Sequence, residues 1–326
     1  MPGQQVAGAV NVRQVIPRDA IPSVDDPEFG ATYSGDDEDD VVVLDTCDPA
    51  RAYPVRYLNY HEVVNDTVDG DPVAVTWCPL CGSAVVYDRR VNGQPLEFGV
   101  SGKLADDDLV MYDRQTDSEW KQSLGECIRG DLEGVKLDVL PASLVSWREF
   151  REAYPDGVVL QAPGGESEAA SDGDEPTPID YDESPYDEYV DGEGFGLAAH
   201  RGTSGQREWG RDDFGPKTVV LGVEAGGDAV GYPLPEVRDA GGIVADHVGD
   251  RPVVVFATAD GIHAYEDPGC EFELDNDGVV GGGTSWNVAT GTSADGRRLE
   301  RVPSRRLFAF AWADDHGEDA FYHHDA

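Results

Sequence analysis

The sequence predicts a mainly β protein with a few short helices, of the α+β class, in which two related β-rich units from an internal duplication pack as a pseudo-dimer. Two observations lead to this prediction. Short β-branched or aromatic runs bounded by Gly, Asp, Asn or Pro recur along the chain, which is typical of strands. The chain also resembles itself over about 110 residues, and a repeated order of motifs indicates repeated structural units.

Five runs predict the strands of the first unit. Each is short and rich in valine or aromatic residues, and each lies next to residues that favour turns. They are VVVLD at 41–45, PVAVTW at 72–77, SAVVYD at 83–88, LEFGVS at 96–101 and DLVMYD at 108–113.

Two stretches predict short helices in the same unit. The valines, leucine and tyrosine of residues 55–66 suit one face of an amphipathic helix. Residues 143–155 predict the second helix, because Ser143 can cap its first turn and Pro155 ends it. Both helices are short, so we expect sheets to dominate the fold.

In the self-comparison, residues 41–160 align with residues 217–323. A Tyr-Pro pair, the start of a strand, a tryptophan and a glycine recur in the same order and at similar spacing. The matched pairs are Tyr53-Pro54 with Tyr232-Pro233, Pro72-Val73 with Pro252-Val253, Trp120 with Trp286, and Gly125 with Gly291. We therefore predict a first β-rich repeat at 41–160 and a second, degenerate repeat at 217–326.

Two further segments complete the predicted organisation. Residues 1–40 are an N-terminal extension. Residues 161–216 connect the repeats, and their first half is acidic, rich in Gly, Pro and Ser, and without periodicity, which predicts a linker. The part from 185 to 216 carries aromatic residues and arginines, so we expect it to pack on one of the repeats.

The charge of the chain excludes one class of partner. There are 65 acidic and 24 basic residues, for a net charge of −41. Such a chain repels nucleic acid, whose binding needs a basic face. Because the acids are spread over every segment, they predict adaptation to high salt, where a dense carboxylate surface stays hydrated and its repulsion is screened. No run of 18 apolar residues and no signal peptide is present, so we expect a cytoplasmic protein with no membrane partner.

Several long motifs resemble a known family. In chain order they are RAYPVRYLNYHEVVND, VTWCPLCGSAVVYDR, FGVSGKLADDDLVMYDRQTDSEWKQ and GVKLDVLPASLVSWREFREAYP. They are similar to the uncharacterised family catalogued as domain of unknown function 3179, and the acidic composition suggests a haloarchaeal-type member. The resemblance covers nearly the whole chain. It implies little about activity, because the family has no settled function.

The CPLCG stretch is the strongest candidate for chemistry. Cys78 and Cys81 stand opposite Thr258 and Gly261 in the self-comparison, so only the first repeat carries the pair. A closed zinc ribbon would need a second Cys-x-x-Cys, which the chain lacks. Three readings stay open. The pair could join His61 in a three-ligand site for zinc, copper(I) or iron, could form a redox disulfide, or could be an inert hairpin.

Other polar residues found only in the first repeat are candidates for the surroundings of this site. His61 and Asn65 are four residues apart, so a helix over 55–66 would point both the same way. Arg114 could bind an anionic or polar ligand, or could simply belong to a salt-bridged hairpin. The predicted surrounding residues are Arg56, Asn65, Ser101 and Arg114. The sequence thus leaves two classes of function. The first is an enzyme, metal-binding protein or redox protein that uses a metal ion or a small molecule. The second is a non-catalytic binding or structural module.

Overall fold

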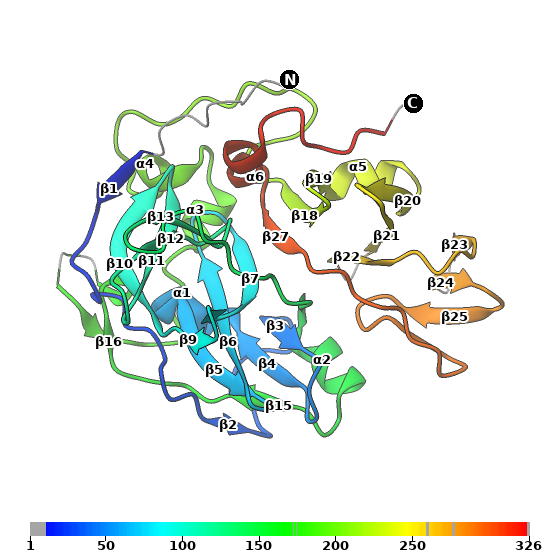
Figure 1. The fold of residues 1–326 in the computed structure, drawn as a ribbon, viewed down its shortest axis with the longest axis horizontal. Coiled ribbons are helices and arrows are strands. Elements are labelled where there is room, and N and C mark those ends of the chain that lie inside the picture. The colour runs from blue at the N-terminus through cyan, green and yellow to red at the C-terminus, as the bar shows by residue number, and fades with distance from the viewer. Residues whose placement is uncertain (1–10, 172, 174, 259–260, 276–277, 325–326) are drawn as a thin grey trace.

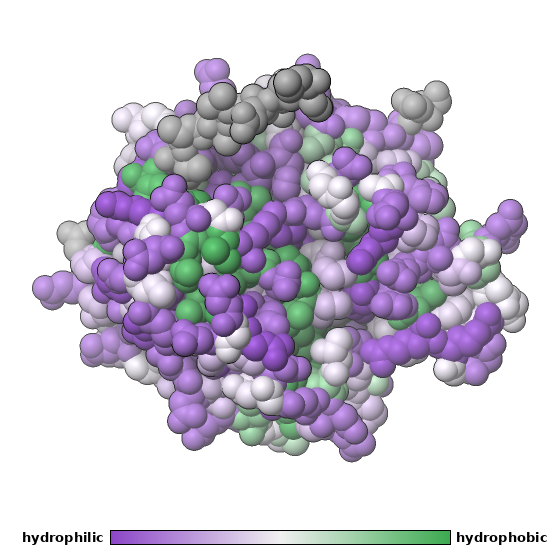
Figure 2. Space-filling model, in the orientation of Figure 1, coloured by the Kyte–Doolittle hydropathy of each residue, from purple (hydrophilic) through white to green (hydrophobic). Residues whose placement is uncertain are grey.

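Sheets dominate the fold, as the sequence predicts, and the helices between them are short (Figure 1). We describe a computed structural model that covers residues 11–171, 173, 175–258, 261–275 and 278–324. Hydrophilic side chains cover most of the face drawn in Figure 2, with smaller hydrophobic areas between them. Within the described residues, no helix is both long and apolar enough to cross a membrane.

The first half is built around a hairpin to which three further strands are added. β3 (Asp40–Leu44) and β4 (Arg51–Pro54) pair antiparallel, and the three valines of β3 are buried. β14 pairs with the free edge of β3, while β15 pairs parallel with β4 and antiparallel with β2. The added strands are β14 (Ser143–Ser146), β15 (Val158–Leu160) and β2 (Phe29–Gly30). Residues predicted as an N-terminal extension therefore contribute to this sheet.

The helix expected over 55–66 is shorter than predicted. α1 (Val55–His61) ends where Glu62 takes a positive φ of 58°, and β5 (Val63–Val68) follows directly. The prediction was wrong from position 62 onward, because the consecutive β-branched residues there pair with β6 (Asp71–Cys78) instead of continuing the helix. Since Asn65 lies on the strand, it does not share a helix face with His61.

The second predicted helix also starts later than expected. Residues 143–146 form strand β14, and the helix α2 runs over Trp147–Ala153. Its N-cap is Ser146, whose side chain accepts a hydrogen bond from the Glu149 backbone while the Glu149 carboxylate accepts one from Ser146. The predicted cap at Ser143 was wrong because β3 recruits that residue into the sheet.

The first half contains a second, antiparallel sheet. Its strands follow the order β1-β10-β11-β12-β13, and a bulge interrupts β10 between Val100 and Lys103. The strands are β1 (Val12–Gln14), β10 (Phe98–Ala105), β11 (Asp108–Asp113), β12 (Glu119–Lys121) and β13 (Glu126–Arg129). A short hairpin of β8 (Arg90–Val91) and β9 (Gln94–Pro95) precedes β10 in the chain.

The connecting segment 161–216 is folded against the rest of the chain. Tyr189, Phe195 and Phe214 are buried in the main hydrophobic core, together with residues from both halves. Its elements are β16 (Glu166–Ser167), η1 (Glu168–Ala170), β17 (Thr177–Pro178), α3 (Asp187–Asp191) and α4 (Gly196–His200).

One sheet joins the two halves. Its strand order is β19-β18-β27-β7-β6-β5, in which β27 (Arg305–Phe308) from the second half pairs with β7 (Ser83–Asp88) from the first (Figure 1). The other strands of the second half are β18 (Val219–Ala225), β19 (Asp228–Pro233), β20 (Ile243–Val248), β21 (Arg251–Thr258), β22 (Gly261–Glu266), β23 (Phe272–Asp275), β24 (Gly278–Gly281), β25 (Thr284–Asn287) and β26 (Thr292–Ser293). Its helices are α5 (Leu234–Asp239) and α6 (Ala309–His316).

The two halves share an order of elements. In each, a hairpin leads through a short helix into a three-stranded meander, and a late strand returns to the first strand of the hairpin. The returning strands are β14 beside β3 and β27 beside β18. A duplication would produce this arrangement; the duplication itself stays a prediction.

Candidate functional site

The two cysteines lie on a tight hairpin at the end of β6. Cys78 is the last residue of β6 and pairs with Ser83, so residues 79–82 form the turn that carries Cys81. Gly82 has a φ of 53°, and a Cβ there would lie 2.8 Å from the Phe308 ring. Glycine is therefore needed both for the turn and for close packing.

Two segments distant in sequence, β27 and α3, hold this turn. The Phe308 backbone N–H donates to the Cys81 carbonyl (2.7 Å), and Arg306 Nη1 donates to the Gly82 carbonyl (2.8 Å). Tyr189 Oη donates to the Leu80 carbonyl (2.7 Å). Each turn carbonyl from position 80 to 82 thus accepts a bond from the second half or from the connecting segment, which fixes the positions of both sulfurs.

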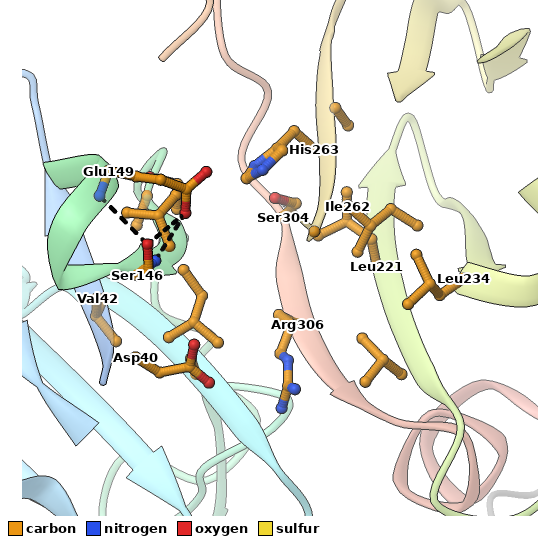
Figure 3. A pocket seen from close by; sticks show the side chains of 18 of the residues that line it. Asp40, Val42, Ser146, Glu149, Leu221, Leu234, Ile262, His263, Ser304 and Arg306 are labelled. Atoms are coloured by element: carbon orange, nitrogen blue, oxygen red, sulfur yellow. Dashed lines mark hydrogen bonds between the residues drawn. The ribbon is translucent and has the colours of Figure 1, made fainter. Parts of the chain in front are cut away.

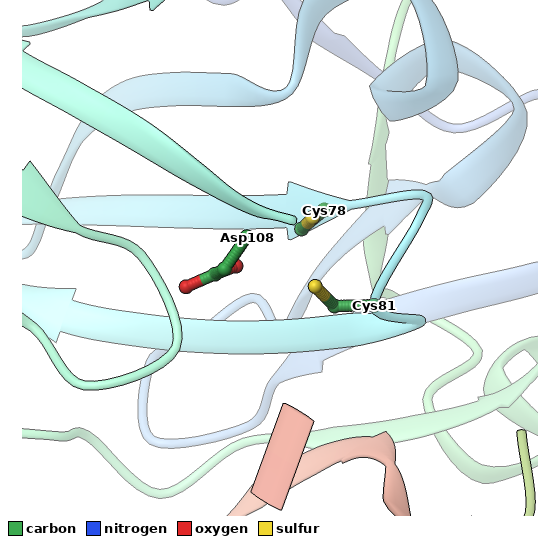
Figure 4. Close-up of side chains that lie close together, drawn as sticks. All are labelled: Cys78, Cys81 and Asp108. Atoms are coloured by element: carbon green, nitrogen blue, oxygen red, sulfur yellow. The ribbon is translucent and has the colours of Figure 1, made fainter. Parts of the chain in front are cut away.

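A third potential ligand comes from the start of β11. The Sγ atoms of Cys78 and Cys81 and a carboxylate oxygen of Asp108 lie within 4.8 Å of one another, and all three residues are buried (Figure 4). Sequence reasoning missed Asp108, although it begins a predicted strand. Its 30-residue distance from the cysteines gave no signal, since only the packing of β11 against the hairpin brings the groups together.

Burial dominates the electrostatics of the three groups. It raises the pKa of the Cys78 thiol, and it raises that of Cys81 well above the ordinary value, with the Cys78 sulfur as a further cause. Burial also raises the pKa of Asp108 to about 6, against an opposing effect of Lys121. Without a cation, burial therefore favours the protonated form of both thiols, and that of Asp108 below about pH 6.

The nearest buried cation already has a carboxylate partner. Lys121 Nζ lies 2.6 Å from Asp315 Oδ1 on α6, and among the described residues no ion pair joins it to Asp108. Asp108 Oδ2 accepts a hydrogen bond from the Ser123 backbone N–H (2.9 Å), whereas Oδ1 has no hydrogen-bond partner in the described part of the chain. One oxygen of this buried carboxylate thus remains available to a ligand.

His61 is engaged elsewhere. Its Nδ1 donates to the Pro22 carbonyl (2.9 Å), and its Nε2 accepts from Tyr181 Oη (2.7 Å). Burial lowers the pKa of its imidazole. The ligand group assembled by the described residues thus contains Asp108 in the place that the sequence suggested for His61.

The four predicted surrounding residues form hydrogen bonds or ion pairs in other parts of the fold. Arg56 binds the Tyr181 carbonyl and Asp182, and Asn65 Nδ2 donates to Asp25 Oδ1 and to the Phe98 carbonyl, 2.7 Å each. Ser101 Oγ donates to the Val110 carbonyl. Arg114 pairs with Asp25 (3.0 Å) and Glu97 (2.8 Å), which agrees with the salt-bridged alternative.

Two cavities lie next to the sheets described above. One, of about 660 Å³, is lined by Cys78, Glu62 and the connecting segment. The other, of about 290 Å³, lies between the halves, with Asp40 and Glu149 on one wall and Leu221 and Ile262 on the other (Figure 3). The Glu149 carboxylate at this second cavity already caps α2.

The fold and site define a β-rich protein with a buried dithiol–carboxylate group beside a ligand-sized cavity. The chain belongs to the family described as protein of unknown function DUF3179, which matches residues 18–319. No curated protein and no solved structure matches it.

Proposed function

We propose that this protein binds a thiophilic divalent metal ion, zinc in the first place, through Cys78, Cys81 and Asp108. The observation that carries the proposal is the convergence of two sulfurs and one carboxylate oxygen within 4.8 Å in the protein interior. Sulfurs bound to zinc at about 2.3 Å in tetrahedral geometry lie about 3.8 Å apart, so ligands at these separations need only small adjustments to share one ion.

The donor set favours zinc among the candidate metals. Thiolates suit zinc, copper(I) and iron, whereas a carboxylate oxygen suits zinc and iron(II) better than the softer copper(I). Three protein ligands leave a fourth position, which is typical of zinc sites that bind water or substrate. Cys78 also lines the 660 Å³ cavity, so a molecule held there would lie next to the metal site.

The charges near the site support a cation. Glu62 and Asp108 both act to raise the pKa of the Cys78 thiol, on top of its burial. A divalent ion would replace the protons on the thiols and offset the buried carboxylate. These same groups disfavour the thiolate that a redox pair needs for attack, because reactive cysteines lie in electropositive, partly exposed surroundings.

Metal analysis of protein purified in multimolar KCl tests the proposal. We expect a single zinc ion per chain in the wild type, and its loss in Cys78→Ser, Cys81→Ser and Asp108→Asn. Cys127→Ser is the matched control, since Cys127 is buried at 1% exposure but its Sγ donates to the Arg129 carbonyl, away from the site. In cobalt-loaded protein, the sulfur-to-cobalt absorption should disappear in Cys78→Ser and persist in Cys127→Ser.

Two outcomes would overturn the proposal. If the wild type takes up no metal and Cys78 and Cys81 oxidise reversibly to a disulfide, the pair is a redox centre. If the wild type takes up no metal and forms no disulfide, the hairpin is inert and its thiols serve only the packing of the core.

We further propose that the protein works in the cytoplasm at high salt and binds no nucleic acid. The net charge of −41 supports both the salt adaptation and the exclusion of polyanions. All five cysteines are free, which is typical of a reducing compartment.

A further inference from the structure

We propose that the 660 Å³ cavity beside Cys78 binds a small organic cation, an amine or guanidine with an apolar body, and that the Glu62 carboxyl group holds its charged end. The inference does not depend on a metal ion at the cysteines. It rests on the side chain of Glu62, on its backbone and on the charges and walls of the cavity.

The Glu62 side chain is a buried acid without a partner. It is 7% exposed and lines the cavity. Among the residues that the structure describes, no hydrogen bond or ion pair reaches its carboxylate. Its backbone, in contrast, is fixed: the N–H donates to the Leu58 carbonyl (2.7 Å), and the carbonyl accepts from Trp77 N–H (2.8 Å). A buried carboxyl is costly unless something pairs with it, so its place in a cavity wall points to a ligand.

The second half shows what the backbone at this position prefers. Gly242 occupies the corresponding turn before β20, with a φ of 81°, and its carbonyl accepts from Ala257 N–H (2.9 Å) just as Glu62 accepts from Trp77. Glu62 adopts a φ of 58°, a region that side-chain-bearing residues rarely enter. Glycine would adopt this backbone conformation with less strain, so we infer that the carboxyl group of Glu62 serves a function other than folding.

The remaining charges leave Glu62 uncompensated. The cations that line the cavity face other carboxylates: Lys103 pairs with Glu119, and Arg201 lies 4.0 Å from Glu168. His200 stacks on the Tyr186 ring, with centroids 5.0 Å apart, and burial lowers its pKa. Asp108 and Glu168 add negative potential at Glu62. The cavity therefore favours a positive group at this end.

The walls suit an apolar body. Side chains from the N-terminal segment, the hairpin turn, β10 and α4 enclose the cavity, and the rings of Tyr60 and Tyr186 line it beside Glu62. Aromatic faces attract cations, so carboxylate and rings together form a recognition site for an ammonium or guanidinium group. Apolar residues in the lining include Ile16, Ile21, Leu80, Val100, Leu104 and Leu109.

Calorimetric titration with benzylamine in multimolar KCl tests this inference, with benzyl alcohol and benzoate as the neutral and anionic analogues. We expect benzylamine to bind the wild type more tightly than either analogue. Glu62→Gln should weaken binding about tenfold or more, since it removes a charged hydrogen bond. Glu62→Gly introduces the residue that the second half tolerates at this turn, so it should fold and lose binding as well.

Glu183→Gln is the control at the exposed rim of the cavity and should bind benzylamine as the wild type does. The inference is wrong if benzylamine fails to bind the wild type, if benzoate binds equally well, or if Glu62→Gln and Glu62→Gly retain full affinity. Because no metal is needed, the titration is run with and without a chelator, and loss of binding only with the chelator would place the amine on a metal ion instead of on Glu62.

Discussion

The hairpin of the first half and the hairpin of the second half differ at their tips. In the first, Cys78 pairs with Ser83 and residues 79–82 form the turn. In the second, Thr258 pairs with Gly261, so only positions 259–260 separate the strands. The first hairpin is therefore longer by two residues, and Cys81 lies on the additional chain.

This difference corrects the sequence comparison in one respect. By strand register the counterpart of Gly261 is Ser83, whereas the sequence placed Cys81 opposite it. A strand pair conserves its register because a slip would turn buried side chains outward, but its turn can lengthen without disturbing the sheet. The sulfur pair thus arises where the scaffold tolerates change.

Away from the hairpin turns, the two halves share several side-chain contacts. Tyr53 Oη donates to Asp66 (2.6 Å), and Tyr232 Oη donates to Asp246 (3.0 Å). A Cβ at Gly125 would lie 2.5 Å from the Tyr87 ring. A Cβ at Gly291 would lie 2.5 Å from the Tyr265 ring in the same way. Such matched contacts allow paired substitutions to test how far the likeness extends.

The largest effect should come from removing salt. At a net charge of −41, unscreened repulsion opposes the compact state. We expect loss of folding in dilute buffer and stability in multimolar KCl, where the Debye length is about 3 Å. Because β27 and β7 join the halves in one sheet, circular dichroism and tryptophan fluorescence should report a single transition. A melting temperature independent of KCl would contradict the salt adaptation, and two separate transitions would show that the halves fold independently.

Next in size are Gly125→Ala and Gly291→Ala. Both glycines have a positive φ, 66° and 71°, and a methyl group at either would overlap a tyrosine ring. We expect each change to lower the free energy of unfolding by about 3 kcal/mol, from backbone strain and overpacking. Chemical denaturation in KCl measures both. Gly93→Ala, where a Cβ meets nothing within 4 Å, should cost only about 1 kcal/mol. Unequal losses at the two main positions would break the comparison.

Glu62→Gln should raise stability in a pH-dependent way. Burial raises the pKa of Glu62 from 4.5 to about 8, so between these values the folded state keeps a proton that the unfolded state releases. The free energy of unfolding of the wild type therefore falls as the pH rises through this window. The variant should exceed the wild type by about 2–4 kcal/mol above pH 8 and match it below about pH 4.5. Denaturation of chelator-treated protein across this range measures the difference, and a constant difference would refute the buried-acid explanation.

The smallest effects should come from Tyr53→Phe and Tyr232→Phe. Each removes one hydrogen bond to an aspartate, at an expected cost of about 1–2 kcal/mol for Tyr53 and about 0.5–1 kcal/mol for Tyr232. The first should be larger because Asp66 is buried, whereas Asp246 is half-buried. Paired denaturation curves give both values, and a larger loss at Tyr232 would reverse this ranking.

The sequence by itself determined the class of the fold and much of its scaffold. Alternating and β-branched runs predicted β3, β6, β7, β10 and β11, because the pattern typical of a strand depends only on residues that are neighbours in sequence. The boundaries failed where tertiary pairing competed with local preference: β6 draws residues 63–68 into a strand, and β3 draws residues 143–146 into another. The aromatic residues of 185–216 were expected to pack on one repeat, and Tyr189, Phe195 and Phe214 lie in a core that contains residues of both halves.

Only the tertiary structure decided the composition of the site. Local spacing brought Cys78 and Cys81 together, because a hairpin turn holds two residues three positions apart close to each other. Asp108 joins them, and His61 turns to Pro22 and Tyr181, through contacts between segments distant in sequence. The sequence showed no sign that Glu62 would be a buried acid facing a cavity, since its exposure depends on the connecting segment that covers it. Residue type and spacing determine which chemistry a chain can offer, whereas burial and pairing, which set the charge and reach of each group, arise only when the sheets pack.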